Sequence, residues 1–154
     1  MRHAEDPHAH LRSLPLFAGC SNDELAAIDA LSDEVHVPAG RPLIRQGDIG
    51  REFIIVISGE AAVTRDDVEI ARLGPGSYFG ELALLASTVR NASVTAVTPL
   101  TVEVIDRRGF QTLLEDSPGL TRTLLLSTAR RLAELDAENR TLRGEQPVDD
   151  HITE

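Results

Sequence analysis

The chain has 154 residues, of which 42% are hydrophobic and 26% charged, and its formal net charge is -10. This length fits one domain with a core of its own. The acidic balance argues against nucleic acid or an anionic membrane surface as a partner, because both attract basic side chains. A lone cysteine, Cys20, excludes an internal disulfide, and neither a signal peptide nor a membrane span is recognisable. We therefore expect a cytoplasmic protein.

Residues 1–10 are polar and contain three histidines. Either a metal-binding tail or a flexible terminus would fit, and the flexible tail is favoured because no partner ligand is fixed nearby. The domain is expected to begin at residue 11. Ser21 and Glu24 have the spacing of a capping box, and the apolar residues that follow predict one face of an N-terminal helix.

Residues 34–106 consist of short apolar or alternating runs separated by glycine, proline and aspartate. Turn signals every 8 to 12 residues indicate an antiparallel sandwich or barrel, with a hairpin tip at residues 65–67. A metal-dependent β-roll would need histidine and glutamate ligands from several strands. His36 stands alone among the predicted strands, so no metal site is expected.

The chain becomes helical after Asp106. Residues 107–115 predict one helix, and a break at 116–118 precedes a long helix over about 120–142. Residues 143–154 are acidic and are expected to form a flexible tail. The expected fold is therefore mainly β with flanking helices, and the C-terminal helices occupy about 107–142.

The segment from Phe79 to Leu85, followed by Arg90, carries most of the chemistry. Gly80 and Glu81 precede a predicted short helix, whose unpaired N–H groups attract an anion. Gly80 permits close approach of the backbone, and Arg90 can donate forked, charge-assisted hydrogen bonds to the same anion. Glu81 would repel a phosphate and should face a donor such as a ribose hydroxyl.

This arrangement resembles the phosphate-binding cassette of the cyclic nucleotide-binding domain family, which includes regulatory subunits of protein kinase A, the catabolite activator protein and cyclic-nucleotide-gated channels. Segments 39–48, 53–60 and 73–76 also resemble the family, in the same order, so the likeness covers about residues 11–142. It implies an antiparallel, jelly-roll-like β-roll with an N-terminal helix, a short cassette helix and a long C-terminal helix.

The resemblance also implies roles for individual residues. Arg90 would bind the cyclic phosphate and Glu81 the ribose. Asp48 would either pair with Arg90 or serve only as a turn residue. Asn91 stands where the family helps to read the base, so the choice between cAMP and cGMP stays open, with cAMP favoured. Tyr78 and Phe79 are expected mainly as core aromatics. The ligand-binding set is Gly80, Glu81, Leu82, Ala83, Arg90 and Asn91, where Leu82 and Ala83 offer backbone amides.

The long C-terminal helix also has the pattern of a coiled-coil seam. Two sets of residues spaced by seven define its a and d positions, and they predict a parallel homodimer. The alternative is that this face packs on the β-roll of the same chain. The family's base-contacting pair on this helix falls at Leu135 and Asp136, which departs from its usual threonine and serine. The expected seam is Leu125, Thr128, Leu132, Leu135, Asn139 and Leu142.

Three functions compete. A cyclic nucleotide sensor is favoured, in which the ligand moves the C-terminal helices through a hinge at residues 107–117 and an unidentified effector responds. A cyclic nucleotide hydrolase would need a metal cluster or an activated nucleophile, neither of which is recognisable, so no catalytic residues and no cofactor are expected. An interaction and dimerisation module with a lost or altered ligand is the remaining alternative.

Overall fold

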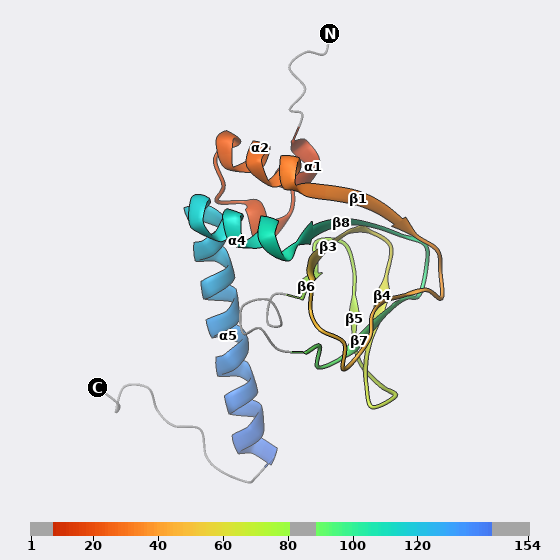
Figure 1. Ribbon diagram of the computed structural model, residues 1–154. Helices are drawn as coiled ribbons and strands as arrows, with labels where there is room; N and C mark the ends of the chain where they lie inside the picture. The colour runs from red at the N-terminus through yellow and green to blue at the C-terminus, as the bar shows by residue number, and fades with distance from the viewer. Residues whose placement is uncertain (1–7, 81–88, 143–154) are drawn as a thin grey trace, which may run out of the picture.

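The computed structural model describes residues 8–80 and 89–142 (Figure 1). Within these ranges, eight strands form two four-stranded antiparallel sheets, in the orders β1-β8-β3-β6 and β2-β7-β4-β5. The predicted β-roll is therefore confirmed. The strands are β1 Ser32–Val37, β2 Pro42–Ile44, β3 Glu52–Ser58, β4 Ala61–Arg65, β5 Val68–Leu73, β6 Tyr78–Phe79, β7 Ser93–Ala96 and β8 Leu100–Asp106.

Helices lie on one side of the β-roll, as Figure 1 shows. The N-terminal part contains α1 (Ala9–Arg12), a 3-10 helix η1 (Pro15–Phe17) and α2 (Asn22–Leu31). After the last strand come α4 (Arg107–Asp116) and α5 (Pro118–Leu142), with 25 residues in α5. Both C-terminal helices match the predicted ones to within two residues. Within the residues that the structure describes, no helix is long and apolar enough to cross a membrane.

Helix α1 is a short helix close to the expected N-terminal boundary of the domain at residue 11. It begins at Ala9, inside the segment that was expected to be a flexible tail. Leu11 is fully buried, and the N–H groups of Leu11 and Arg12 both donate to the His8 carbonyl, at 3.0 and 2.9 Å. Burial of Leu11 offsets the cost of ordering this short turn. The rest of that tail, residues 1–7, and the predicted acidic tail, residues 143–154, lie outside the described residues.

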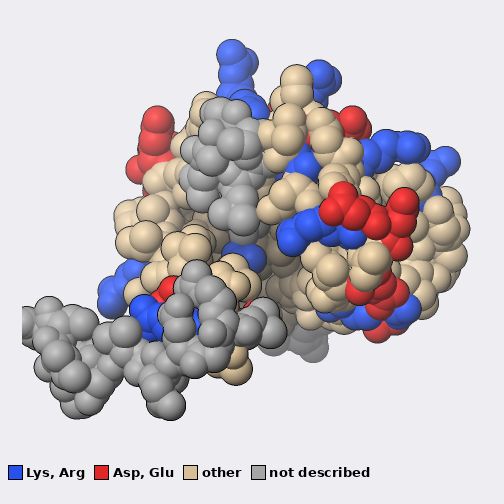
Figure 2. Space-filling model, turned by 90° about the horizontal axis from the view of Figure 1, so that it is seen from below, with Lys and Arg blue, Asp and Glu red and all other residues tan. Residues whose placement is uncertain are grey.

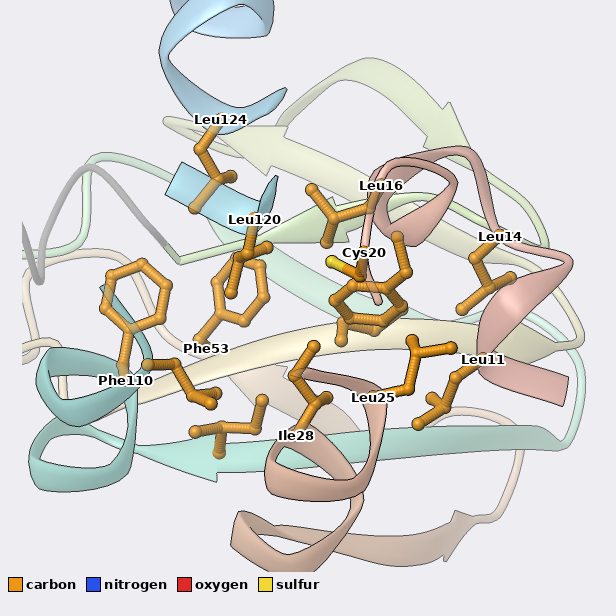
Figure 3. Packing of buried hydrophobic residues seen from close by; sticks show 14 residues of the cluster. Leu11, Leu14, Leu16, Cys20, Leu25, Ile28, Phe53, Phe110, Leu120 and Leu124 are labelled. Atoms are coloured by element: carbon orange, nitrogen blue, oxygen red, sulfur yellow. The ribbon is translucent and has the colours of Figure 1, made fainter. Parts of the chain in front are cut away.

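The first core lies between the helices and one face of strands β3 and β8 (Figure 3). Phe53 and Ile55 of β3 point to this side, while Ile54 and Val56 point into the space between the two sheets. Successive side chains of a strand point to opposite faces, so β3 is buried on both. The Phe53 ring stacks on that of Phe110 in α4, with centroids 4.8 Å apart. Leu120 and Leu124 bring the start of α5 into the same core.

Glu24 ties the beginnings of two helices together. The predicted capping box is present: Ser21 Oγ accepts from the Glu24 N–H at 3.1 Å, and Glu24 Oε1 accepts from the Ser21 N–H at 2.8 Å. The second oxygen, Oε2, accepts from the N–H of Gly119 in the first turn of α5 at 2.9 Å. A Cβ at Gly119 would lie 2.7 Å from the Gly19 carbonyl oxygen, so only glycine allows this close approach.

Candidate functional site

Gly80 directly follows strand β6, and its backbone has φ +101°, a conformation that favours glycine. Space is also restricted at this position. A Cβ would lie 2.5 Å from the Glu52 carbonyl oxygen and 2.7 Å from Nη1 of Arg90. The absence of a side chain therefore lets the guanidinium of Arg90 pack directly against the backbone of Gly80.

Arg90 is only 6% exposed, although an arginine side chain is permanently charged. Its Nη2 donates to the Glu52 carbonyl at 2.7 Å and its Nη1 to the Gly80 carbonyl at 3.2 Å. Its backbone is fixed as well, because its N–H donates to the Asp48 carbonyl at 2.7 Å and its carbonyl accepts from the Gly47 N–H at 2.9 Å. A buried cation that is oriented in this way is suited to binding an anion.

Arg90 and Gly80 line a cavity of about 250 Å³ between the β-roll and helix α5. The lining combines apolar side chains from several strands with polar groups from the Arg90 segment and from α5. Among the described residues of the lining are three arginines and no carboxylate. The lining residues are Ile44, Val63, Arg65, Leu73, Tyr78, Phe79, Gly80, Arg90, Asn91, Ala92, Val94 and Arg131.

Three of the predicted site residues thus meet at one cavity: Gly80, Arg90 and Asn91. Asn91 is exposed, and its carbonyl accepts a hydrogen bond from Nε of Arg65 at 3.0 Å. The predicted ribose ligand Glu81, the two predicted backbone donors Leu82 and Ala83, and the predicted cassette helix lie outside the described residues. Their roles stay predictions.

Asp48 lies on the other side of Arg90. Together with Arg90 and Arg45 it lines a second, more polar cavity of about 560 Å³. The contact between Asp48 and Arg90 that the structure shows runs through the backbone, from the Arg90 N–H to the Asp48 carbonyl. The predicted pairing of the Asp48 carboxylate with the Arg90 guanidinium stays a prediction.

Tyr78 and Arg131 also line the cavity, and Arg131 is the one that the sequence analysis did not consider as a site residue. Tyr78 was expected mainly as a core aromatic, yet it is only half-buried and lines the cavity, as does Phe79. The Tyr78 hydroxyl donates to Ser127 Oγ of α5 at 2.7 Å, and the Arg131 guanidinium lies 5.6 Å from the centre of the Tyr78 ring. These contacts depend on how α5 docks, so no local signal in the sequence could have identified them.

The base-contacting pair of the family corresponds to Leu135 and Asp136, and neither of these residues lines the cavity. Leu135 is 57% exposed, and Asp136 pairs with Arg140 one turn further along α5 at 2.9 Å. Arg131, four residues before Leu135, occupies the cavity wall instead. Among the described residues of α5, Arg131 is therefore the one that lines this cavity.

The face of α5 that was predicted to dimerise is exposed. Leu125, Leu132 and Leu135 are between 57% and 67% exposed, and Asn139 is exposed as well. These residues do not pack on the β-roll of the same chain, which was the alternative interpretation of their pattern. The side chain of Leu142 lies outside the described part of the chain.

Charged side chains on the face in Figure 2, and potential metal ligands among the described residues, show no second candidate site. On the face that Figure 2 shows, basic side chains are separated by uncharged ones and lie beside acidic side chains, so they form no continuous basic surface. Within residues 8–80 and 89–142, no group of three or more histidine, cysteine, aspartate or glutamate side chains could hold a metal ion.

Comparison with known proteins agrees with this geometry. The family model described as cyclic nucleotide-binding domain matches residues 34–117. A cAMP-dependent protein kinase regulatory subunit of Eremothecium gossypii is 42% identical over 106 residues, which are 68% of this chain and 23% of the relative. This chain thus spans about a quarter of that relative's length.

Two solved structures extend the likeness to the whole architecture. The catabolite activator protein of Thermus thermophilus superposes with a TM-score of 0.78 at 32% identity, over 84% of this chain and 63% of that one. The regulatory subunit of a cAMP-independent protein kinase A from Trypanosoma brucei gives 0.71 at 25% identity, over 79% and 45%. Both the sequence match and the shared fold lead to one assignment: the chain belongs to the cyclic nucleotide-binding domain family.

Proposed function

We propose that this chain is a cyclic nucleotide sensor that binds cAMP in preference to cGMP and does not itself catalyse a reaction. The observation that carries this proposal is the buried guanidinium of Arg90, held by the carbonyls of Gly80 and Glu52 at the wall of the cavity. Such a group supplies the fixed positive charge that a cyclic phosphate needs. The kinase relative, whose name specifies cAMP, supports the choice of base.

The remaining predicted residues would complete the ligand site. Gly80 would admit the phosphate close to the backbone, and the amides of Leu82 and Ala83 would donate to it. Glu81 would accept a hydrogen bond from the ribose, while Asn91 would face the base or the phosphate. We also propose that the Asp48 carboxylate pairs with Arg90 at the second cavity. Ligand binding at Arg90 would then change the conformation of the loop that precedes β3.

Helix α5 would carry the signal. Arg131 lines the cavity and Tyr78 bonds to Ser127, so a ligand that fills the cavity meets the helix directly. A ligand can shift α5 only by the difference between its affinities for two helix positions. We propose that the occupied cavity holds α5 against the roll, and that an effector protein recognises this position.

Calorimetric titration of the purified, nucleotide-free chain with cAMP and cGMP tests the proposal. Arg90→Ala should weaken binding by about ten- to a hundredfold, because it removes a charge-assisted contact, and Arg90→Lys should not restore it fully. Arg72→Ala is a matched control, since Arg72 is an exposed arginine that pairs with Glu69 and Glu60 away from the cavity. A folded wild-type chain that binds neither nucleotide would contradict the proposal.

A second candidate function rests on the exposed leucines of α5. Leu125, Leu132 and Leu135 form an apolar stripe suited to a second copy of the helix, so we also propose a parallel homodimer. If the ligand site has been altered in this chain, dimerisation would be its main activity. Sedimentation without nucleotide and the calorimetric titration together separate the two functions. A dimer that binds no nucleotide in the titration supports the interaction module, whereas nucleotide binding supports the sensor.

A further inference from the structure

Arg65 brings a further positive charge to the cavity from the β4–β5 hairpin. It is the last residue of β4, and its side chain lines the cavity together with Arg90 and Arg131. The protein as a whole has a formal net charge of -10, so a gathering of arginines at a small cavity is not a consequence of composition. Like charges around one cavity repel each other unless an anion lies between them.

The position of Arg65 is fixed by contacts on both of its sides. Its Nε donates to the Asn91 carbonyl at 3.0 Å, directly beside the backbone of Arg90. On the other side, the turn residues Asp66 and Asp67 have φ +53° and +67°, as a tight hairpin turn with two left-handed residues requires. Strand β4 therefore ends at Arg65, directly before the turn, and the Arg65 guanidinium lies next to the Arg90 segment.

Gln46 holds this turn against the neighbouring strands. Its side-chain Nε2 donates to Asp66 Oδ1 at 2.9 Å, and its Oε1 accepts from the Asp66 N–H at 2.9 Å. Its own N–H donates to Ser93 Oγ at 2.8 Å. Two hydrogen bonds thus fasten the hairpin tip to the loop after β2, and a third holds that loop to β7, although the tip is exposed. This rigidity favours a defined position for the Arg65 side chain over a freely solvated one.

From this geometry we infer that Arg65 is a second ligand-binding arginine, which donates to the cyclic phosphate of the ligand beside Arg90. The inference rests on the proposed function of the site. A cyclic phosphate has two exocyclic oxygens, and two arginines can each bind one of them. Arg90 is buried and Arg65 is exposed, so the contribution of Arg65 is the smaller one and is screened more strongly by salt.

Affinities of the wild type, Arg65→Ala, Arg90→Ala and Arg72→Ala test this inference, with cAMP and cGMP at low and at high salt. Arg72 is the matched control, because it belongs to the same hairpin and is exposed but does not line the cavity. Arg65→Ala should lower the affinities for cAMP and cGMP by the same factor, about three- to tenfold at low salt and less at high salt. A loss of affinity that differs between cAMP and cGMP would contradict the inferred contact between Arg65 and the phosphate.

Phosphorothioate analogues sharpen the test, because each diastereomer replaces one exocyclic oxygen by sulfur, a weaker hydrogen-bond acceptor. For the diastereomer whose sulfur faces Arg65, the loss caused by Arg65→Ala should be smaller than for the other one, and Arg90→Lys should show the opposite preference. Equal losses for both diastereomers would overturn the inference.

The outcomes separate this inference from the proposed function. If the wild type binds neither nucleotide, the proposed function fails and the inference fails with it. If the wild type binds, Arg90→Ala loses binding and Arg65→Ala matches Arg72→Ala, only the inference fails. Melting temperatures of all variants exclude loss of folding as the cause.

Discussion

The Tyr78 hydroxyl donates a hydrogen bond to Ser127 Oγ at 2.7 Å, and this bond joins strand β6 to helix α5. Tyr78 also packs against Phe53, with ring centroids 5.7 Å apart, and lies beneath the guanidinium of Arg131. One side chain thus contacts the core, the cavity and the long helix. Any change in the position of α5 has to change the surroundings of Tyr78.

We expect Tyr78→Phe to loosen α5 from the roll. Loss of the bond to Ser127 should lower the free energy of unfolding by about 1 kcal/mol. Ser127→Ala should lower the free energy of unfolding by a similar amount. The double variant should be only slightly less stable than either single variant, because each single substitution already removes the same hydrogen bond. Urea unfolding measures all three. Fully additive losses would show that the two side chains act independently.

Gly80→Ala should disrupt both folding and ligand binding. The added Cβ would collide with the Glu52 carbonyl and with Nη1 of Arg90, and the φ of +101° adds strain. Gly40→Ala is the matched control: its φ is +87°, but no atom lies within 4 Å of the added Cβ. Backbone strain alone should lower the free energy of unfolding of Gly40→Ala by about 1 kcal/mol, and the loss in Gly80→Ala should be larger. Equal losses would contradict the close packing of Arg90 on Gly80.

Glu24 should make stability depend on acid pH. Hydrogen bonds from the N–H groups of Ser21 and Gly119 lower the pKa of its carboxyl below the ordinary value of 4.5. Because the folded pKa is below the unfolded one, the stabilisation is complete above pH 4.5 and is lost as the pH falls through the folded pKa. Glu24→Gln should therefore be less stable than the wild type at pH 7, and the difference should shrink below pH 4.5. Glu138→Gln, an exposed change on α5, is the control.

Glu103 should make the protein less stable as the pH rises, which is opposite to the effect of Glu24. Its side chain is in strand β8 and is 3% exposed, and burial raises the pKa of its carboxyl above 4.5. A raised folded pKa means that ionisation destabilises the fold, so the cost appears as the pH rises from 4.5 through the folded pKa. Glu103→Gln should be more stable than the wild type at pH 7 and equal to it near pH 4. Unfolding at a series of pH values checks the sign, which an unchanged or lowered stability at pH 7 would contradict.

Leu132→Asp should abolish the proposed dimer. A charge in the middle of an apolar helix seam is costly to bury in both copies. Val68→Asp is a matched control, because Val68 and Leu132 are both 62% exposed but Val68 lies on strand β5, away from α5. Sedimentation equilibrium should report a monomer for Leu132→Asp and a dimer for the wild type and for Val68→Asp. A wild type that remains monomeric at high concentration would refute the seam.

Local signals in the sequence predicted most of the fold. The capping box of Ser21 and Glu24, the hairpin tip after Arg65 and the break before Pro118 each depend on a few adjacent residues, and each is found where it was expected. The meeting of Gly80, Arg90 and Asn91 at one cavity could also be anticipated, because this segment resembles the phosphate-binding cassette of the family.

What the sequence could not provide depends on contacts between distant elements. Arg131 reaches the cavity only because α5 docks on β6, 53 residues earlier in the chain at Tyr78. The start of α1 at Ala9 likewise depends on burial of Leu11 in a core formed with distant residues. For the same reason the sequence left open which residues of α5 face the cavity. Helix periodicity identifies a face but not the neighbour that the face meets.

The attachment of α5 to Glu24 at one end limits how this helix can move. The bond from Gly119 to Glu24 ties the first turn of α5 to the start of α2, so the proposed movement of α5 would be a swing about this turn and not a slide along the helix axis. A helix of 25 residues is about 37 Å long, and Ser127 lies roughly 14 Å from its start. Under the proposed signalling through α5, a displacement at the cavity would grow about two- to threefold by the far end, and α5 would act as a lever whose pivot is the Glu24 carboxylate.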